Sequence, residues 1–115
     1  DAYEFGASIP GWDDPGAFHS VDLWFFFETL AKCWRPFVGE HYDLARQMCD
    51  YLCNFIKSGD PNGIGTDGNQ LPGWPRIDPQ DPVIMSFKDT AKTVRQRMSS
   101  VEKALLDAFF ARLKV

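Results

Sequence analysis

Histidine is the side chain best suited to proton transfer near neutral pH, and the sequence has two, His19 and His41. His19 follows the Gly- and Pro-rich stretch 10–16 (PGWDDPG) and directly precedes a stretch with a helical pattern. It is therefore expected on the kind of loop where α/β proteins commonly place reactive side chains. The N-terminus of the following helix would disfavour the charged imidazolium, which helps His19 to accept a proton. Taken alone, however, a loop histidine more often makes one structural hydrogen bond.

The other residues that could do chemistry form no recognisable site. His41 stands beside Glu40 and Asp43 at the start of a second helical pattern, so it is expected to face solvent. The histidines and cysteines contain no C-x-x-C or H-x-x-x-H pair, so no metal site is expected. The stretch 59–68 (GDPNGIGTDG) is rich in glycine but lacks the Lys-Ser/Thr of a phosphate loop, and no cofactor is expected.

A catalytic serine with its usual surroundings is absent from the sequence. No G-x-S-x-G occurs, so a strand-to-helix nucleophile elbow cannot be built from this chain. A glycine-rich HGGG-type run, which would supply an oxyanion hole, is absent as well.

The three cysteines, Cys33, Cys49 and Cys53, cannot close a full disulfide framework because their number is odd. Cys49 and Cys53 stand four residues apart in a helical pattern, where Cβ atoms lie about 5 to 6 Å apart. A disulfide prefers a Cβ separation of about 3.8 Å. Free, buried thiols are therefore predicted, which favours a reducing compartment such as the cytoplasm.

Composition limits the classes of partner. The net charge of −4 does not suit a nucleic-acid binder. The longest apolar stretch, residues 23–27, is far short of the roughly 18 residues that a membrane span needs. Aromatic residues make up 15% of only 115 residues, so part of their surface is expected to face another body. Asp1 is not preceded by an initiator Met or a signal pattern, which suggests a processed chain or an excised piece.

Hydrophobic periodicity predicts two helices in the first half of the chain. Apolar residues recur at helical spacing over residues 23–34, until Pro36 breaks the pattern. A second helix is predicted over about residues 42–57, with Asp43 as its N-terminal cap. Gly59 suits the left-handed position that follows such a helix.

The second half of the chain is predicted to hold a strand and a third helix. Residues 59–82 contain turn signals throughout and are expected to be loop. Residues 83–87 (VIMSF) are strand-like, as is the stretch 3–7 near the N-terminus. Ser99 and Glu102 have the spacing of a capping box and announce a last helix that continues to the end of the apolar pattern.

These elements predict an α/β fold with two strands and about three helices in one unit. A pair of strands is marginal alone. Such a set suits the edge of a larger sheet covered by helices, so the chain is expected to be part of a larger folded structure.

The run 16–23 (GAFHSVDL) resembles the GAxHxx(E/D)L segment that carries the catalytic histidine in type B carboxylesterases. These enzymes form the para-nitrobenzyl esterase and cholinesterase branch of the α/β-hydrolase fold. Further segments match in the same order: 34–37 (WRPF), 48–55, 58–62 (SGDPN), 71–75 (LPGWP) and 85–87 (MSF). The similarity covers roughly residues 1–90, and residues 91–115 match poorly. Residues 1–115 are thus expected to be the C-terminal portion of a carboxylesterase catalytic domain, with its two strands at the edge of the α/β-hydrolase sheet.

The resemblance implies roles for His19 and Asp22. His19 would be the general base of a Ser-His-Glu triad, taking the serine proton and later protonating the leaving alcohol. The family's chain order places the serine, the acid and the oxyanion hole upstream, so this chain alone is expected to be inactive. Asp22 matches an acidic position that supports the histidine loop, although a carboxylate complementing the helix dipole fits equally well. The implied partners are a small ester substrate and the rest of the esterase domain, without cofactor or metal.

Two other interpretations stay open. The chain can be a non-catalytic, cholinesterase-like interaction module that keeps the histidine motif without a working triad. It can also form a homodimer that hides aromatic helix faces and unpaired strand edges. Residues 12–18 and 24–27 are the segments expected to line a pocket, although core packing is favoured for the second.

Overall fold

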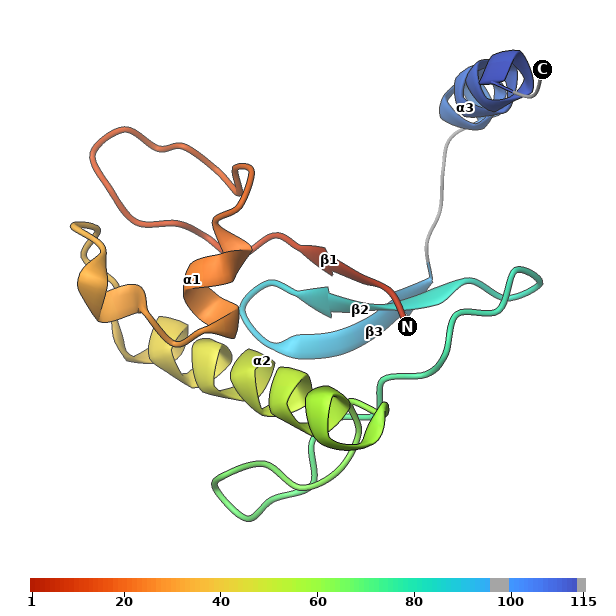
Figure 1. Ribbon diagram of the computed structural model, residues 1–115. Coiled ribbons are helices and arrows are strands. Elements are labelled where there is room, and N and C mark those ends of the chain that lie inside the picture. Colours follow the sequence, from red (N-terminus) through yellow and green to blue (C-terminus); the bar gives the residue numbers. More distant parts are fainter. Residues whose placement is uncertain (96–99, 114–115) are drawn as a thin grey trace.

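The computed structural model describes residues 1–95 and 100–113, which form an α/β arrangement of three strands and three α-helices (Figure 1). In chain order the elements are β1 (Tyr3–Phe5), α1 (Asp22–Phe26), a 3-10 turn (Leu30–Lys32), α2 (Gly39–Ser58), β2 (Val83–Phe87), β3 (Ala91–Arg95) and α3 (Ser100–Leu113). The sheet has the order β1-β2-β3, with β1 parallel to β2 and β2 antiparallel to β3. The predicted α/β class is confirmed, but the sheet has three strands where two were expected.

The additional strand, β3, follows β2 after a tight turn. The prediction had Lys88 end the strand-like run, and β2 does end at Phe87, but the chain then folds back and pairs over residues 91–95. Lys92 and Thr93 of β3 are exposed, and Arg95 forms an ion pair with Asp81. Charged residues are typical of edge strands, and they hide the strand pattern in the sequence.

The first predicted helix is much shorter than expected. α1 ends at Phe26, and Glu28 has a positive φ of 50°, which interrupts the helix before the 3-10 turn. The backbone N–H of Thr29 donates to the carbonyl of Trp24 at 2.9 Å, which closes the end of α1. The helical pattern over residues 23–34 therefore corresponds to two short turns, because the chain must bend to bring Phe25 and Leu30 into the core.

α2 is the long helix of the molecule, and its ends differ in how well they were predicted. Gly59 follows the helix with a φ of 78°, in the left-handed conformation expected of it. The N-terminus begins three residues earlier than predicted, and Asp43 is not its cap. Instead, the backbone N–H of Val38 donates to Nδ1 of His41 at 3.0 Å.

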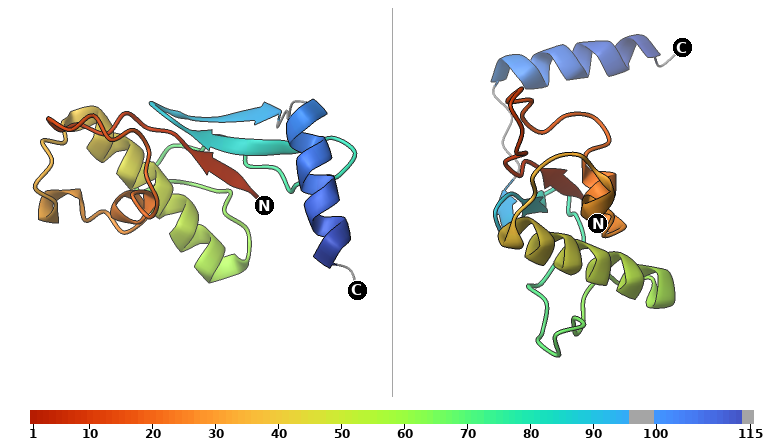
Figure 2. Two further views of the ribbon diagram at one scale, coloured as in Figure 1. Left: turned by 90° about the horizontal axis from the view of Figure 1, so that it is seen from above. Right: turned by 90° about the vertical axis from the view of Figure 1, so that its left-hand side faces the viewer.

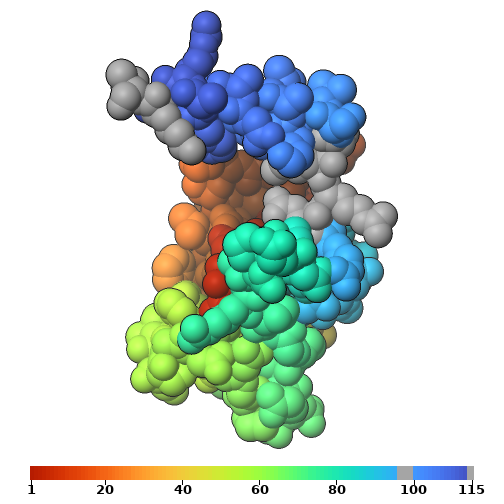
Figure 3. Space-filling view, turned by 90° about the vertical axis from the view of Figure 1, so that its right-hand side faces the viewer, coloured from red at the N-terminus to blue at the C-terminus, as the bar shows by residue number. Residues whose placement is uncertain are grey.

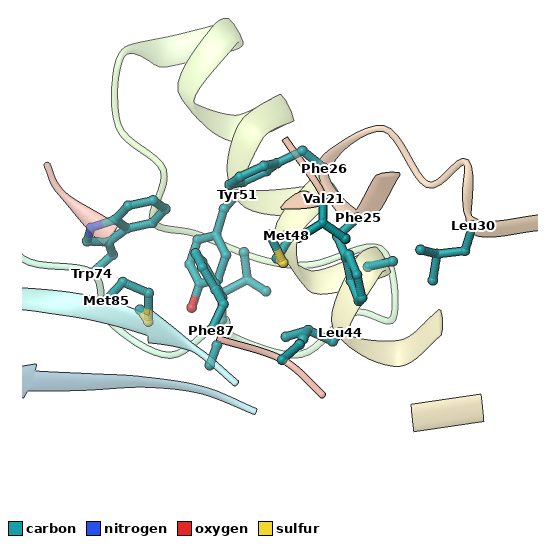
Figure 4. Packing of buried hydrophobic residues seen from close by; sticks show 14 of the residues in the cluster. Val21, Phe25, Phe26, Leu30, Leu44, Met48, Tyr51, Trp74, Met85 and Phe87 are labelled. Atoms are coloured by element: carbon teal, nitrogen blue, oxygen red, sulfur yellow. The ribbon is translucent and has the colours of Figure 1, made fainter. Parts of the chain in front are cut away.

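The core lies between the sheet and the two helices α1 and α2 (Figures 1 and 4). Phe87 of β2 is fully buried, and its ring packs against Phe26 of α1 and Tyr51 of α2, with ring centroids 6.0 and 5.9 Å apart. Trp74 also contacts the ring of Phe87, at 5.6 Å. The indole Nε1 of Trp74 donates to the carbonyl of Ala2 at 2.9 Å, which ties the segment between α2 and β2 to β1.

The segment 59–82 is irregular, as expected, but it is fastened to α2. The hydroxyl of Tyr51 donates to the carbonyl of Pro72. The carboxylate of Asp50 is buried and accepts the backbone N–H of Thr66 at 2.9 Å. Leu71 is buried in the core, so this loop completes the hydrophobic cluster.

α3 stands apart from the sheet and the other helices (Figures 1 and 2). Every described residue of α3 is exposed. In the space-filling view, α3 forms one end of the molecule, opposite α2 and the loop that follows it (Figure 3). The predicted cap of this helix, Ser99, lies outside the described residues. None of the helices in the described ranges is long and apolar enough to cross a membrane.

Candidate functional site

The candidate site is the segment between β1 and α1, which presents His19 just before the helix. The imidazole is exposed. The backbone N–H of Val21 donates to the carbonyl of Phe18 at 3.2 Å, so His19 lies within a tight turn. Ser20 has a φ of 68°, in the left-handed region that is costly for a residue with a side chain. α1 is only five residues long, so the helix dipole expected to act on His19 is small.

His19 and Asp22 are close in sequence but have different partners. The carboxylate of Asp22 accepts a hydrogen bond from the hydroxyl of Tyr3 at 2.6 Å, which joins the first turn of α1 to β1. Burial, together with the Asp22 carboxylate, raises the pKa of Tyr3 to about 12. Over residues 1–95 and 100–113, no hydrogen bond or ion pair reaches the ring of His19. Its side chain thus faces solvent without a fixed partner in this part of the chain.

His41, which was expected to face solvent, is buried instead. Its side chain is only 9% exposed. Nδ1 accepts the backbone N–H of Val38, and Nε2 donates to the carbonyl of Ser8 at 3.0 Å. Both ring nitrogens are therefore occupied by backbone groups, and His41 has no position from which to exchange a proton with a substrate. The expectation was wrong because Ser8 is far away in sequence.

A cluster around Arg35 lies against the histidine-bearing segment. The Arg35 guanidinium makes two parallel hydrogen bonds to the carboxylate of Asp13, at 2.9 and 3.0 Å. A third bond runs from Nη1 to the carbonyl of Pro10 at 3.1 Å. The guanidinium carbon also lies 4.5 Å from the ring centroid of Trp34 and 5.2 Å from that of Phe18. The hydrogen bond from Arg35 holds the pKa of the Asp13 carboxyl below its usual value.

Sequence reasoning missed the pairing of Arg35 with Asp13. The sequence placed Arg35 next to Pro36, in the segment 34–37 that resembles the family, and Asp13 in the turn-rich stretch 10–16, with nothing to connect the two. Periodicity carries no information on a contact that spans 22 residues between two irregular segments. The only signal was an arginine placed after an apolar run, where its charge would need a partner if buried.

One apolar cavity of about 360 Å³ lies beside α1 and α2. Leu23 and Phe26 of α1 and the next residue, Phe27, contribute to its wall, and the last two belong to the segment 24–27 that was expected to line a pocket. The segment 12–18 does not line it, and neither does His19. The cavity is therefore separate from the Arg35 cluster.

The cysteines are free, as predicted. They are less buried than expected, because Cys53 is exposed and the other two are half-buried. The sulfur atoms of Cys49 and Cys53 lie 3.9 Å apart, and burial raises the pKa of the Cys49 thiol to about 12. Within the described ranges, no three His, Cys, Asp or Glu side chains are grouped so as to hold a metal ion.

The fold is that of known esterases. An esterase from the anaerobe Clostridium hathewayi, described as hydrolysing aliphatic aromatic polyesters, is 25% identical, with a TM-score of 0.69 over 91% of this chain and 19% of that chain. The carboxylesterase EST55 of Geobacillus stearothermophilus is also 25% identical, with a TM-score of 0.62 over 89% of this chain and 20% of that one. The chain thus has part of the α/β-hydrolase fold of serine esterases.

Sequence comparison gives the same class. Human cocaine esterase is 34% identical over 64 residues, which are 55% of this chain and 11% of that protein. The model of the carboxylesterase family matches residues 2–106. The chain belongs to the carboxylesterase family, and the resemblance drawn from the histidine motif is confirmed. It spans about a tenth of the human relative and a fifth of the two bacterial ones.

Proposed function

We propose that this chain supplies the general base of a serine carboxylesterase, and that the base is His19. The imidazole accepts the proton of a serine hydroxyl as the serine attacks the carbonyl carbon of a carboxylic ester. It then protonates the leaving alcohol, and repeats both steps with water to release the acid. The serine, the acid that orients the imidazole, and the oxyanion hole come from the remainder of the catalytic domain.

The difference between the two histidines is the observation that carries this proposal. His19 is exposed on a turn before α1, whereas both ring nitrogens of His41 are held by backbone groups. A general base must offer a ring nitrogen to the nucleophile, within hydrogen-bond reach. Of the two, His19 alone meets that requirement, and it lies in the run 16–23 that resembles the family's histidine motif, within the residues 2–106 that the family model matches.

The open edge of β1 supports an incomplete catalytic domain. Within the described residues, β1 has a hydrogen-bonded neighbour on one side, which is β2. An unpaired strand edge is a liability that folded proteins cover. We propose that the rest of the esterase domain adds its sheet at this edge, and that Asp22 keeps α1 seated on β1 through Tyr3.

The proposed function is tested with the complete open reading frame that encodes this chain. His19→Ala is expected to lower kcat for a para-nitrophenyl ester by at least about 10,000-fold, as for other triad bases, with a much smaller change in KM. Asp14→Asn is the matched control, because Asp14 is exposed in the same loop and asparagine tolerates its φ of 42°. The control should retain the rate of the unchanged protein.

Each result of this experiment decides a question. A His19→Ala rate within threefold of the unchanged protein would overturn the assignment of the base. If the complete protein itself shows neither turnover nor labelling by a fluorophosphonate, then the non-catalytic interaction module is the better description. The 115-residue chain alone is expected to show no turnover, because it lacks the nucleophile elbow.

A further inference from the structure

We propose that Arg35 is a positioning residue for His19: it clamps the segment 10–18 from its first residue to its last and so fixes where the imidazole stands. This inference rests on the proposed function of His19. The established family assignment gives Arg35 no role, and the residue contacts neither the sheet edge nor the apolar cavity described above.

The contacts of Arg35 reach both ends of the segment. At the start, Nη1 donates to the carbonyl of Pro10 at 3.1 Å. In the middle, the guanidinium donates two hydrogen bonds to the Asp13 carboxylate, at 2.9 and 3.0 Å. At the end, it lies 5.2 Å from the ring centroid of Phe18, the residue bonded directly to His19. One planar cation thus joins the backbone, a side chain and an aromatic ring of one loop.

The burial of Arg35 makes these contacts strong. Its side chain is 9% exposed and that of Asp13 is 30% exposed, so the ion pair is partly shielded from water. Paired, charge-assisted hydrogen bonds in such a setting have a defined geometry as well as a favourable energy. The guanidinium is also flanked by the ring of Trp34 at 4.5 Å, which restricts its orientation. These contacts restrict the loop where it has no regular structure.

Gly11 supports the same interpretation. Its φ is 150°, and a Cβ built there would lie 2.5 Å from Nη1 of Arg35 and 2.7 Å from Oδ1 of Asp13. The loop backbone therefore approaches the ion pair as closely as only glycine allows. A side chain at this position would displace the guanidinium from its partners.

The loop needs such a clamp because its backbone is not held by a helix or a strand. Asp14 and Ser20 both have positive φ angles, of 42° and 68°. Residues with side chains enter this region at a cost, and they persist there when surrounding contacts fix them. His19 adjoins Ser20. If the segment were loosened, the turn would relax and the imidazole would shift from its position.

The test is made in the complete esterase with Arg35→Met, Arg35→Lys and the partner variant Asp13→Asn. Arg35→Met is expected to lower kcat by about 100-fold with KM within twofold, because a misplaced base slows the chemical step. Arg35→Lys is expected to lower kcat on the order of 10-fold. An ammonium group can reproduce neither the two parallel hydrogen bonds of the guanidinium nor its packing against the aromatic rings. Arg46→Met is the matched control, because Arg46 pairs with Asp43 and Asp67, away from the loop.

A double substitution separates positioning from general stability. In a His19→Ala background, Arg35→Met should leave the residual rate unchanged, because Arg35 acts only through His19. Amide hydrogen exchange should rise at least about 10-fold over residues 11–18 and stay unchanged in α2. If Arg35→Met does not fold, Asp13→Asn carries both measurements, since the Asp13 side chain is more exposed.

The outcomes distinguish the two proposals. A His19→Ala variant with full activity overturns the proposed function, whatever Arg35 does. If His19→Ala is inactive but Arg35→Met and Asp13→Asn keep kcat within threefold, the positioning role is wrong and the proposed function stands. Equal losses from Arg35→Met with and without His19 would mean a merely structural residue, and would also overturn the inference.

Discussion

Side chains distant in sequence hold the segment that carries His19. His41 donates from Nε2 to the carbonyl of Ser8, and Arg35 donates from Nη1 to the carbonyl of Pro10. Both bonds act on the chain just after β1, where it leaves the sheet. Each satisfies a backbone acceptor that has no strand or helix partner, which is the usual role of side chains in irregular segments. The segment that leads to the exposed His19 is thus anchored in part by the buried His41.

The phenols of Tyr3 and Tyr51 predict how the free energy of unfolding depends on pH. Burial raises the pKa of both Tyr3 and Tyr51 to about 12, and the Asp22 carboxylate contributes to the first shift. In the unfolded chain these groups ionise near pH 10. Their stabilisation is therefore complete below about pH 10 and is lost as the pH rises toward 12, because the unfolded state releases its protons first.

Urea unfolding followed by circular dichroism checks this dependence, from about one pH unit below the unfolded phenol pKa up to about pH 12. Tyr51→Phe should flatten part of the decline in the free energy of unfolding, and Tyr3→Phe a further part. Tyr42→Phe serves as control, because within the described residues no hydrogen bond reaches the Tyr42 hydroxyl, so the decline should stay unchanged. An equal slope in all four proteins would contradict the prediction.

At the scale of elements, the parts predicted from sequence are those whose causes are local. Neighbouring residues determine the helical period of α2, the left-handed conformation of Gly59 and the apolar run of β2. α1 and β3 were missed because distant contacts decide them: the helix breaks to bury Phe25 and Leu30, and β3 exists through its pairing with β2. The same reason hid Arg35 within the site, whereas the motif around His19 was continuous in sequence.

The end of α2 provides a prediction at this scale. A Cβ at Gly59 would meet no atom within 4 Å, so Gly59→Ala should cost only the left-handed backbone, about 1 to 2 kcal/mol. Gly39→Ala is the matched control in the first turn of the same helix. Its Cβ also has open space and its φ is not positive, so the free energy of unfolding should stay the same or rise slightly.

Urea denaturation of both variants measures the difference. A Gly59→Ala protein as stable as the Gly39→Ala protein would show that the turn after α2 adapts to a side chain. In the segment that follows, the backbone N–H and the side-chain amide of Asn62 donate to the Asp60 carboxylate at 3.0 and 2.9 Å. That segment would then be less firmly fixed than these two bonds indicate.

The surface of the whole molecule is unusually apolar for so short a chain. The large apolar residues of α3 are all exposed: Val101, Leu105, Leu106, Phe109, Phe110 and Leu113. The edge of β1 is unpaired within the described residues, and the apolar cavity opens beside α1. Exposed apolar surface of this kind marks contact with another protein chain or with another part of the same protein. In the complete domain the β1 edge and the cavity wall are proposed to be covered by the rest of the sheet, so α3 is the feature that a second copy could use.

The isolated 115-residue chain is therefore expected to self-associate through α3. Static light scattering should give a mass that rises toward twice that of the monomer as the concentration increases. Leu105→Lys combined with Phe109→Lys, on adjacent turns of the helix, should keep the chain monomeric, because two charges would have to lose their water in the interface. The control exchanges Lys103 and Asp107, whose ion pair of 2.7 Å lies on a different side of the helix from Leu105 and Phe109, and should associate like the unchanged chain. A clean monomer of the unchanged chain at all concentrations would contradict the prediction, and equal association of the Leu105 and Phe109 variant would place the contact elsewhere.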